Sequence, residues 1–267
     1  MPKPTILISN DDGIKAQGLR VLIDAVSHLG KIVVVAPKVN QSGKAHGITY
    51  MGPLRFKSVR YRDVAEAYAV EGTPADCVKL AFCEILKRPP ALVLSGINEG
   101  PNWGQSLIYS GTVSAALEGT ILGVSSLAFS LASLAEPHDF SHCPALVSRL
   151  VEWTLKNPLP PAMSLNSNIP PGPLAKIKGY RLTRQGLCRF EESFIQKPDH
   201  RGRHAYWMQG KFTPLGNSRH CDHNAIAQSF VSVTPMSYDL SVMERPRIQG
   251  LDAWRKKFTA WAKKSRF

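Results

Sequence analysis

The sequence has little of what defines membrane, disulfide-bonded or zinc-binding proteins. Its 267 residues include only five cysteines, with no C-x-x-C pair, and no stretch approaches the ~18 apolar residues of a membrane span. The N-terminal apolar run is short and ends at Asn10, so it does not resemble the hydrophobic region of a secretory signal. An odd, scattered set of cysteines is typical of reduced thiols. We therefore expect a cytoplasmic globular protein that makes no membrane contact.

Several nucleotide-binding and hydrolase motifs are also missing. No G-x-G-x-x-G follows the first predicted strand, which argues against a Rossmann-type nicotinamide or flavin site. The absence of G-x-x-x-x-G-K-[ST] argues against a P-loop NTPase, and the absence of G-x-S-x-G argues against an α/β-hydrolase.

Acidic residues are scarce in the second part of the chain. The sequence has 33 Lys+Arg and 20 Asp+Glu, and residues 120–267 hold 20 of the basic residues against 10 acidic ones. Such an excess can bind nucleic acid, attract anionic substrates, or simply form a solvated surface. Because no RRM or KH pattern is present and the aromatic residues are not interleaved with basic ones, we do not expect a nucleic-acid-binding protein.

The first half of the chain alternates short β-branched apolar runs with helical periodicity. Because the predicted strands are continuously apolar, they indicate a parallel sheet covered by helices on both faces. The predicted strands are 5–10, 31–36, 91–97 and 125–131, and the predicted helices are 19–29, 74–86 and 112–122.

The remaining segments are less regular. Residues 48–70 (ITYM, AYAV) indicate an antiparallel excursion, and 143–156 indicate another helix before a proline-rich stretch at 157–173. Strands and hairpins are predicted in the segments that follow, with a strand at 230–235. Residues 251–264 form an amphipathic helix whose aromatic face must be covered by this chain or by a partner.

Polar residues follow the predicted strands, where open α/β sheets bind their ligands. Asp11 and Asp12 directly follow the first strand. Two adjacent carboxylates repel each other unless a cation lies beside them, which favours a metal site. The simpler alternative is an Asx turn that ends the strand. Asn98 ends the strand 91–97 and could offer a further oxygen, or serve only the turn. The long polar loop 37–47 carries Ser42.

The turn Ser110-Gly111-Thr112 opens a predicted helix. Free N–H groups and the positive end of a helix dipole favour phosphate binding there, and a plain N-cap is the alternative. Two further clusters, His220-Cys221-Asp222-His223 and His138/His142/Cys143, have poor ligand spacing, so we expect them to be structural.

Several blocks in fixed order resemble the SurE (survival protein E) family. They are ILISNDDG, APKVNQSG, GTPADCV, VLSGINEGPNWG and YSGTVSAALEG, followed by LNSNIP, GYRLTRQG and FVSVTP. The resemblance implies a Rossmann-like α/β three-layer sandwich with a smaller, hairpin-containing C-terminal part that is used in oligomerisation. On this basis residues 1–157 would form the catalytic core, and 158–267 would complete it and supply the hairpin and the assembly segment of one overall domain.

The resemblance also implies an activity, namely metal-dependent hydrolysis of nucleoside 5′- and 3′-monophosphates and, in some members, of short polyphosphate. The metal ligands would be Asp11, Asp12, Ser42 and Asn98, and Ser110, Gly111 and Thr112 would hold the phosphate. Oxygen ligands suit Mg²⁺ or Mn²⁺, with Ca²⁺ as a further possibility. The expected assembly is a homodimer or a homotetramer.

The residues leave two mechanisms open. In the first, a water activated by the metal attacks the phosphate and Asp12 moves a proton. In the second, Asp11 is a nucleophile that forms an aspartyl-phosphate. The adjacent aspartates together with Ser42 and Asn98 favour a coordination shell, and therefore the first mechanism. Two departures from the family pattern, Lys15–Gly18 after DDG and Cys221–Asn224 before FVSVTP, remove none of the four proposed ligands.

Overall fold

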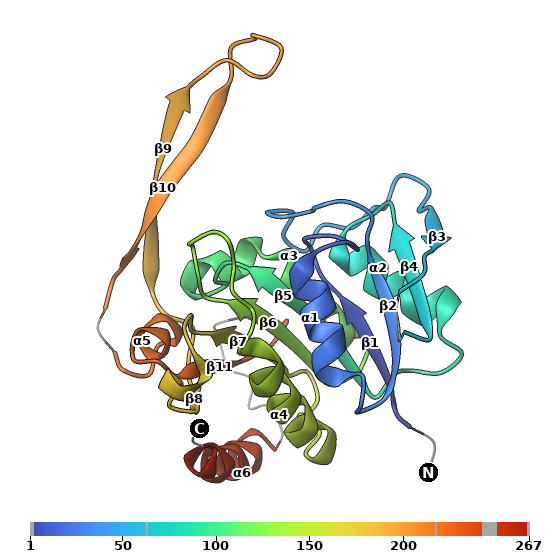
Figure 1. Cartoon of the computed structure of the whole chain (residues 1–267), viewed down its shortest axis with the longest axis vertical. Coiled ribbons are helices and arrows are strands. Elements are labelled where there is room, and N and C mark those ends of the chain that lie inside the picture. The colour runs from blue at the N-terminus through green and yellow to red at the C-terminus, as the bar shows by residue number, and fades with distance from the viewer. Residues whose placement is uncertain (1–2, 62–63, 217, 242–249, 266–267) are drawn as a thin grey trace.

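A central sheet of nine strands forms the body of the molecule. The computed structural model describes residues 3–61, 64–216, 218–241 and 250–265, and the strand order in the sheet is β3-β4-β2-β1-β5-β6-β7-β11-β8 (Figure 1). The six strands from β4 to β7 in this order are parallel. Their bounds are β4 (Glu66–Val70), β2 (Lys31–Pro37), β1 (Thr5–Ser9), β5 (Leu92–Glu99), β6 (Ser126–Leu131) and β7 (Ser164–Ile169).

The outer strands change direction. At one edge β3 (Phe56–Ser58) pairs antiparallel with β4. At the other edge β11 (Val231–Met236) pairs antiparallel with β7, and β8 (Tyr180–Leu182) runs parallel to β11. The carboxyl ends of β1, β2, β5, β6 and β7 therefore lie along one side of the sheet, which we call its carboxyl edge. The carboxyl ends of β11 and β8 lie along the opposite side.

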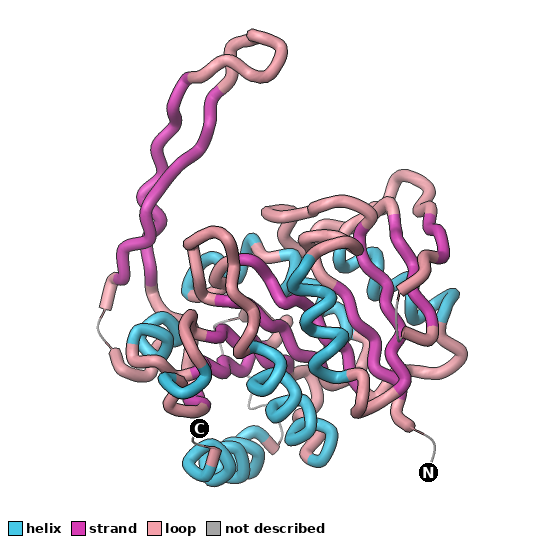
Figure 2. Tube along the Cα trace, viewed as in Figure 1, coloured by secondary structure: helices cyan, strands magenta, loops and turns pink. Residues whose placement is uncertain are grey.

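Side chains that alternate along the strands build two apolar layers. Ile6 and Ile8 of β1 point into a core with α1 (Gln17–Val26) and α4 (Cys143–Lys156), whereas Leu7 packs on the opposite face. That second face is covered by α2 (Pro74–Leu80) and α3 (Gly111–Ile121). Figure 2 shows the helices stacked against the strands. The predicted α/β three-layer sandwich is confirmed.

Two helix starts follow from capping residues that the sequence displays. Thr73 accepts a hydrogen bond from the Asp76 amide and the Asp76 carboxylate accepts one from the Thr73 amide, so the capping box is present. Ser110 caps α3 by accepting a hydrogen bond from the Val113 amide. The predicted helix 74–86 continues beyond α2 as a wider turn, η1 (Ala81–Ile85).

Three details of the sequence-based prediction are wrong. Residues 48–51 form no strand. The antiparallel pairing predicted within 48–70 is present between β3 and β4, but β4 itself runs parallel to β2. The stretch 157–173 contains β7, a central strand of the sheet. Periodicity missed β7 because its buried positions include Ser164, Asn166 and Asn168 rather than an apolar run.

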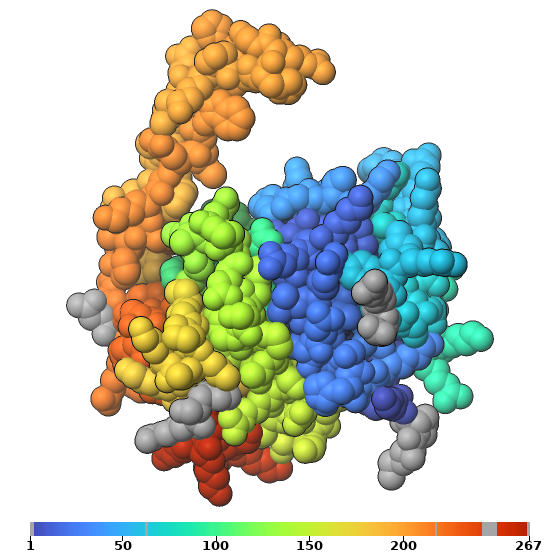
Figure 3. All heavy atoms as spheres, viewed as in Figure 1, coloured from blue at the N-terminus to red at the C-terminus, as the bar shows by residue number. Residues whose placement is uncertain are grey.

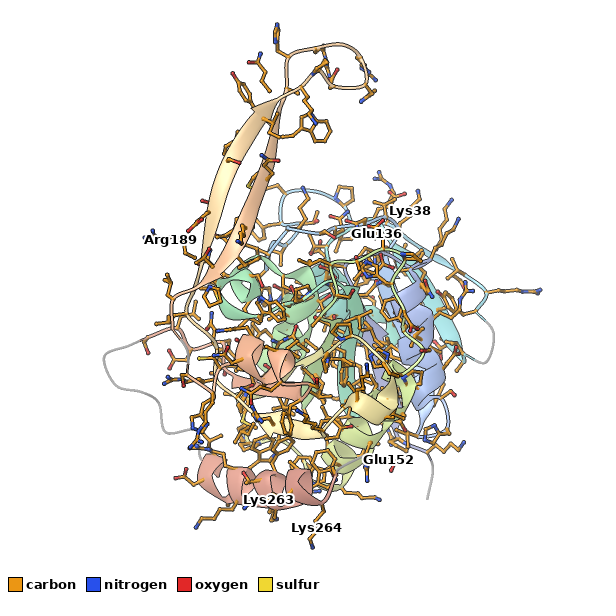
Figure 4. The ribbon with its side chains drawn as sticks, turned by 60° about the vertical axis from the view of Figure 1, so that its left-hand side comes forward. Lys38, Glu136, Glu152, Arg189, Lys263 and Lys264 are labelled. Atoms are coloured by element: carbon orange, nitrogen blue, oxygen red, sulfur yellow. The ribbon has the colours of Figure 1, made fainter. Side chains whose placement is uncertain are left out.

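The C-terminal helix α6 (Leu251–Lys264) packs on this chain. Trp254 and Phe258 are buried, and their rings lie 5.6 and 5.2 Å from the ring of Trp153 in α4. Lys263 and Lys264 point away from the body (Figure 4). The aromatic face predicted from the sequence is therefore covered by the core of the same chain.

A hairpin arm formed by β9 (Cys188–Gln196) and β10 (Tyr206–Pro214) projects from the body (Figure 3). In the part of the chain that the structure describes, its two strands pair only with each other. The arm exposes several large apolar side chains, namely Phe194, Tyr206, Trp207 and Met208. Among the described residues, no helix is both long and apolar enough to cross a bilayer. The remaining short helices are η2 (Gly104–Tyr109), η3 (Leu174–Lys176) and α5 (Asp222–Ala227).

Candidate active site at the carboxyl edge of the sheet

Asp11 lies against the start of α3. It follows β1 and is 3% exposed, and the Thr112 hydroxyl donates a short hydrogen bond to Asp11 Oδ1. Gly111 has no room for a side chain, since a Cβ there would lie 2.7 Å from Asp11 Cβ and 3.0 Å from Asp11 Oδ2. Strand β1 and the turn at 110–112 thus meet at van der Waals distance, as their shared edge of the sheet requires.

Asp12 and Asn98 complete a group of oxygen atoms beside Asp11. Asp12 is half-buried, and its Oδ2 accepts a long hydrogen bond, 3.4 Å, from the backbone amide of Glu99. The Asn98 amide nitrogen donates to Gly100 O at 2.8 Å. This bond fixes the side chain of Asn98, whose Oδ1 then lies 3.4 Å from the Thr112 hydroxyl.

The carboxylates of Asp11 and Asp12 are electrostatically costly where they lie. Burial, the negative charge of Asp11 and that of Glu99 raise the pKa of Asp12 to about 7, against a weaker opposing hydrogen bond from the Glu99 amide. Burial also raises the pKa of Asp11, although hydrogen bonds from Thr112 and the amide of Gly111 oppose the rise. Among the described residues neither carboxylate has an ion-pair partner, and two neighbouring carboxylates in that state are the arrangement that a bound cation stabilises.

The loop that carries Ser42 contacts both aspartates and so brings Ser42 beside the site. The Gln41 amide donates to Asp11 O at 2.7 Å, and Asn40 Nδ2 lies 3.5 Å from Asp12 Oδ1. The Ser42 side chain is exposed, and its amide donates to Asn40 Oδ1 at 2.8 Å. Within the described residues no hydrogen bond joins the Ser42 hydroxyl to either carboxylate. The structure therefore brings together Asp11, Asp12, Asn98 and Thr112, and holds Ser42 at their margin.

A buried polar network that the sequence analysis missed holds the loop after β5. Asn168 accepts from the Asn102 amide at 2.8 Å, and the side chains of Asn166 and Asn168 donate to Asn102 O at 2.8 and 2.9 Å. The Asn102 side chain donates to Ser130 Oγ at 2.9 Å. The signal was available, because polar residues at 164, 166 and 168 repeat with the period of a strand.

The residues 220–223 have a structural role. Asp222 is fully buried, and its carboxylate accepts from the amides of Gly104 and Gly186 at 2.9 and 3.0 Å. These bonds fasten η2 to the base of the hairpin arm. Among the described residues, no group of three or more His, Cys, Asp or Glu side chains could hold a metal, so any metal at Asp11 and Asp12 would also need neutral oxygen ligands.

Comparisons with known proteins match this arrangement. The family model described as "Survival protein SurE" matches residues 6–192. A "5'-nucleotidase SurE" of Vibrio cholerae is 44% identical over 257 residues, which cover 95% of this chain and 94% of that protein. One of Thermosynechococcus vestitus is 41% identical over 93% of this chain and 96% of that protein. The crystal structure of a Sure protein from Aquifex aeolicus covers 96% of this chain and 100% of that one, with a TM-score of 0.78 and 38% identity.

Proposed function

The chain belongs to the SurE family, and from this premise we propose that it is a phosphomonoesterase that hydrolyses nucleoside 5′-monophosphates to nucleoside and phosphate with the help of a divalent metal ion. The curated relatives named 5'-nucleotidase support the reaction class. The single structural observation that carries the metal dependence is the adjacent pair Asp11–Asp12 at the start of α3: Asp11 is buried, Asp12 is half-buried, and neither carboxylate forms an ion pair with any residue that the structure describes. Nucleoside 3′-monophosphates and short polyphosphate are further proposed substrates.

The donor set fits a hard divalent cation. Asp11, Asp12 and Asn98 would hold the ion through carboxylate and amide oxygens, with the Ser42 hydroxyl from the neighbouring loop. All-oxygen ligands suit Mg²⁺ or Mn²⁺, and Ca²⁺ is also compatible with them. When bound, such an ion would withdraw charge from the phosphoryl group and make a bound water more acidic.

The chain's own residues supply phosphate binding and proton transfer. The amides of Gly111 and Thr112 open α3 and bond the Asp11 carboxylate in this structure. They lie at the positive end of the helix, where they would donate to phosphate oxygens when substrate is bound. The Ser110 hydroxyl caps α3 and thereby fixes this turn. Asp12 is the more exposed of the two aspartates, and its carboxylate would take the proton of the attacking water.

The alternative, attack by Asp11 itself, fits the geometry less well. A nucleophilic carboxylate must approach phosphorus in line, whereas Asp11 is 3% exposed and engaged by Thr112. Trapping a phosphorylated aspartate during turnover would favour this alternative over direct attack by water.

Assembly is part of the proposal. The hairpin arm carries Phe194, Tyr206, Trp207 and Met208 in solvent, far from the core of its own chain. Such a surface is typical of a protein–protein interface, and it supports a homodimer or a homotetramer.

The test is phosphate release by the purified protein. AMP, GMP, 3′-AMP, short polyphosphate and p-nitrophenyl phosphate would each be assayed with Mn²⁺, Mg²⁺ or EDTA. We expect release from AMP and GMP that requires the metal and stops with EDTA. If a folded preparation releases no phosphate with any metal, the proposal is wrong, and a non-catalytic protein that binds RNA through its basic half becomes the better account.

A further inference from the structure

The solvent-exposed face of α6 carries a dense positive charge. The helix holds five Lys and Arg side chains and a single carboxylate, Asp252. All five cations are exposed, whereas Trp254 and Phe258 on the opposite face are buried. Among the described residues the five cations form one ion pair, a long contact of 3.9 Å between Arg255 and Asp252. The chain itself therefore leaves most of this charge unbalanced.

Four of the five cations line a groove that runs along α6. Its volume is about 750 Å³, and its lining residues recur at helical spacing from 252 to 264. Arg255 and Lys256 form one pair of cations, and Lys263 and Lys264 form a second pair two turns further on. At a rise of about 1.5 Å per residue, the two pairs lie about 12 Å apart along the helix.

The groove continues beyond α6 along the last strand of the sheet. A second groove shares Leu182 and Arg255 with the first and adds Arg184, which is exposed just after β8. Figure 1 shows α6 below β8, at the side of the molecule that carries the C-terminal elements. Because the two grooves share residues, they form one continuous concave path. Such a path suits a flexible polyanionic chain, which can follow it from cation to cation.

A bilayer surface fits this face less well. A helix that lies on a membrane inserts its apolar face among the lipids. In α6 that face is not available, because Trp254 and Phe258 pack against Trp153 of α4. A flat surface would also leave the concave path unfilled.

The spacing of the cations distinguishes between polyanionic chains. Between the two cationic pairs the groove is lined by uncharged residues, namely Thr259, Ala260 and Leu182. A nucleic-acid strand alternates charged phosphates with uncharged sugars and bases, so its uncharged parts can lie over this section. Inorganic polyphosphate carries a charge on every unit and would place several charges over the uncharged floor, where they lack partners.

We infer that the groove along α6 binds a single-stranded nucleic acid through its phosphates, without preference for sequence. Contacts to phosphates need no RRM or KH motif, and no aromatic residue is among the described residues that line the groove along α6, so base stacking contributes nothing there. The inference does not depend on the proposed function, because none of the residues of the candidate active site lines either groove.

The test measures binding of a fluorescein-labelled oligouridylate of about 16 nucleotides by fluorescence anisotropy. EDTA is present, so that no metal-dependent turnover takes place. The test variant combines Lys256→Gln, Lys263→Gln and Lys264→Gln. Each lost phosphate contact removes about 0.7 from the slope of log K against log salt, so we expect the slope to fall by about 2 and the affinity at low salt to fall at least about tenfold.

A second variant, Ala260→Glu, keeps every cation and places a carboxylate on the uncharged section of the groove. It should also weaken binding several-fold, because the new charge repels the strand. The matched control combines Lys3→Gln, Lys57→Gln and Lys87→Gln. These lysines are exposed and line neither groove, so the control removes the same charge and should bind within about twofold of wild type. All variants should keep the wild-type melting temperature and the wild-type rate of AMP hydrolysis.

Equal loss of binding in the test and control variants would show only the general attraction of a basic protein for RNA, and would overturn the inference. Wild-type affinity of the folded test variant would overturn it as well. So would tighter competition by inorganic polyphosphate than by unlabelled oligouridylate, or binding of wild type to anionic vesicles but not to the oligouridylate. A wild type that binds the oligouridylate and hydrolyses no AMP would overturn the proposed function alone.

Discussion

At the scale of single residues, the site depends on how closely two backbone segments approach. Asp11 ends β1 and Gly111 opens α3, and the Asp11 side chain fills the space that any larger residue at 111 would need. This contact places the carboxylate beside the first amides of the helix. The same amides are the proposed phosphate ligands, so the contact between Asp11 and Gly111 positions both the proposed metal ligand and the proposed phosphate-binding turn.

Replacing Gly111 tests this contact. Gly111→Ala would place a methyl group 2.7 Å from Asp11 Cβ, so Asp11 or the helix must shift. We expect a loss of about 1–3 kcal/mol in the free energy of unfolding and a fall in kcat/KM for AMP of at least tenfold. Gly52→Ala is the control, because the nearest atom to its Cβ is 3.9 Å away and the residue is exposed. Equal activity of both variants would contradict the account.

At the scale of elements, β7 positions the loop that directly follows Asn98 and the end of β5. Asn166 and Asn168 hold both backbone groups of Asn102, at the far end of that loop. Buried side chains of this kind fix a loop because an unpaired backbone group in the same place would cost about 1–3 kcal/mol.

Asn168→Leu should therefore loosen the loop. We expect unfolding by urea to show a loss of about 1–3 kcal/mol, and Mn²⁺ binding to weaken because Asn98 is less well placed. Ser167→Ala is the control on the same strand, since the buried Ser167 hydroxyl has no hydrogen-bond partner among the described residues. A stable Asn168→Leu protein with unchanged Mn²⁺ affinity would show that β7 does not position the site.

Glu118 makes the stability of α3 depend on pH. Despite burial, hydrogen bonds from His46 and Lys79 lower its pKa in the folded protein. Its stabilising effect is therefore complete above its unfolded pKa of about 4.3 and is lost as the pH falls through the lower folded value. We expect Glu118→Gln to be less stable than wild type at pH 7 and the difference to shrink below pH 4. Urea unfolding at several pH values measures this, and a difference that grows in acid would contradict it.

The sequence predicted those elements whose physics is local. Apolar β-branched runs indicated β1, β2, β5 and β6, and Thr73 and Ser110 marked two helix starts. The parallel sheet then placed Asp11, Asp12 and Asn98 at one edge. By contrast, the asparagine side chains of β7 bond a loop more than sixty residues away, and the pairing of His46 with Glu118 also joins distant segments. The alternation of polar residues at 164, 166 and 168 indicates a strand but not what its side chains bond, and no local pattern indicates the partner of His46.

At the scale of the whole molecule, the hairpin arm is the feature that a single chain does not explain. Its strands pair with no other strand of the described residues, and it leaves Phe194 and Trp207 in solvent at 62% and 55% exposure. A long two-stranded ribbon with exposed aromatic residues is marginally stable alone, and contact with another copy would stabilise it.

Removing these aromatic residues should weaken assembly. We expect Phe194→Ser together with Trp207→Ser to lower the oligomer mass measured by light scattering, while circular dichroism of the body is retained. Leu134→Ser, at an exposed apolar residue outside the arm, is the control and should leave the mass unchanged. An unchanged mass in the double variant would show that the arm does not carry the assembly.

Direct measurement of Mn²⁺ binding to wild type and to Asp11→Asn tests the central claim most directly. Asparagine keeps the shape of the buried side chain and removes its charge, so the variant should fold and melt near the wild-type temperature. We predict that wild type binds Mn²⁺, detected by electron paramagnetic resonance, and releases phosphate from AMP. The folded Asp11→Asn protein should do neither. Near-normal Mn²⁺ binding and phosphate release by that variant would contradict the assignment of Asp11, and with it the metal-dependent site.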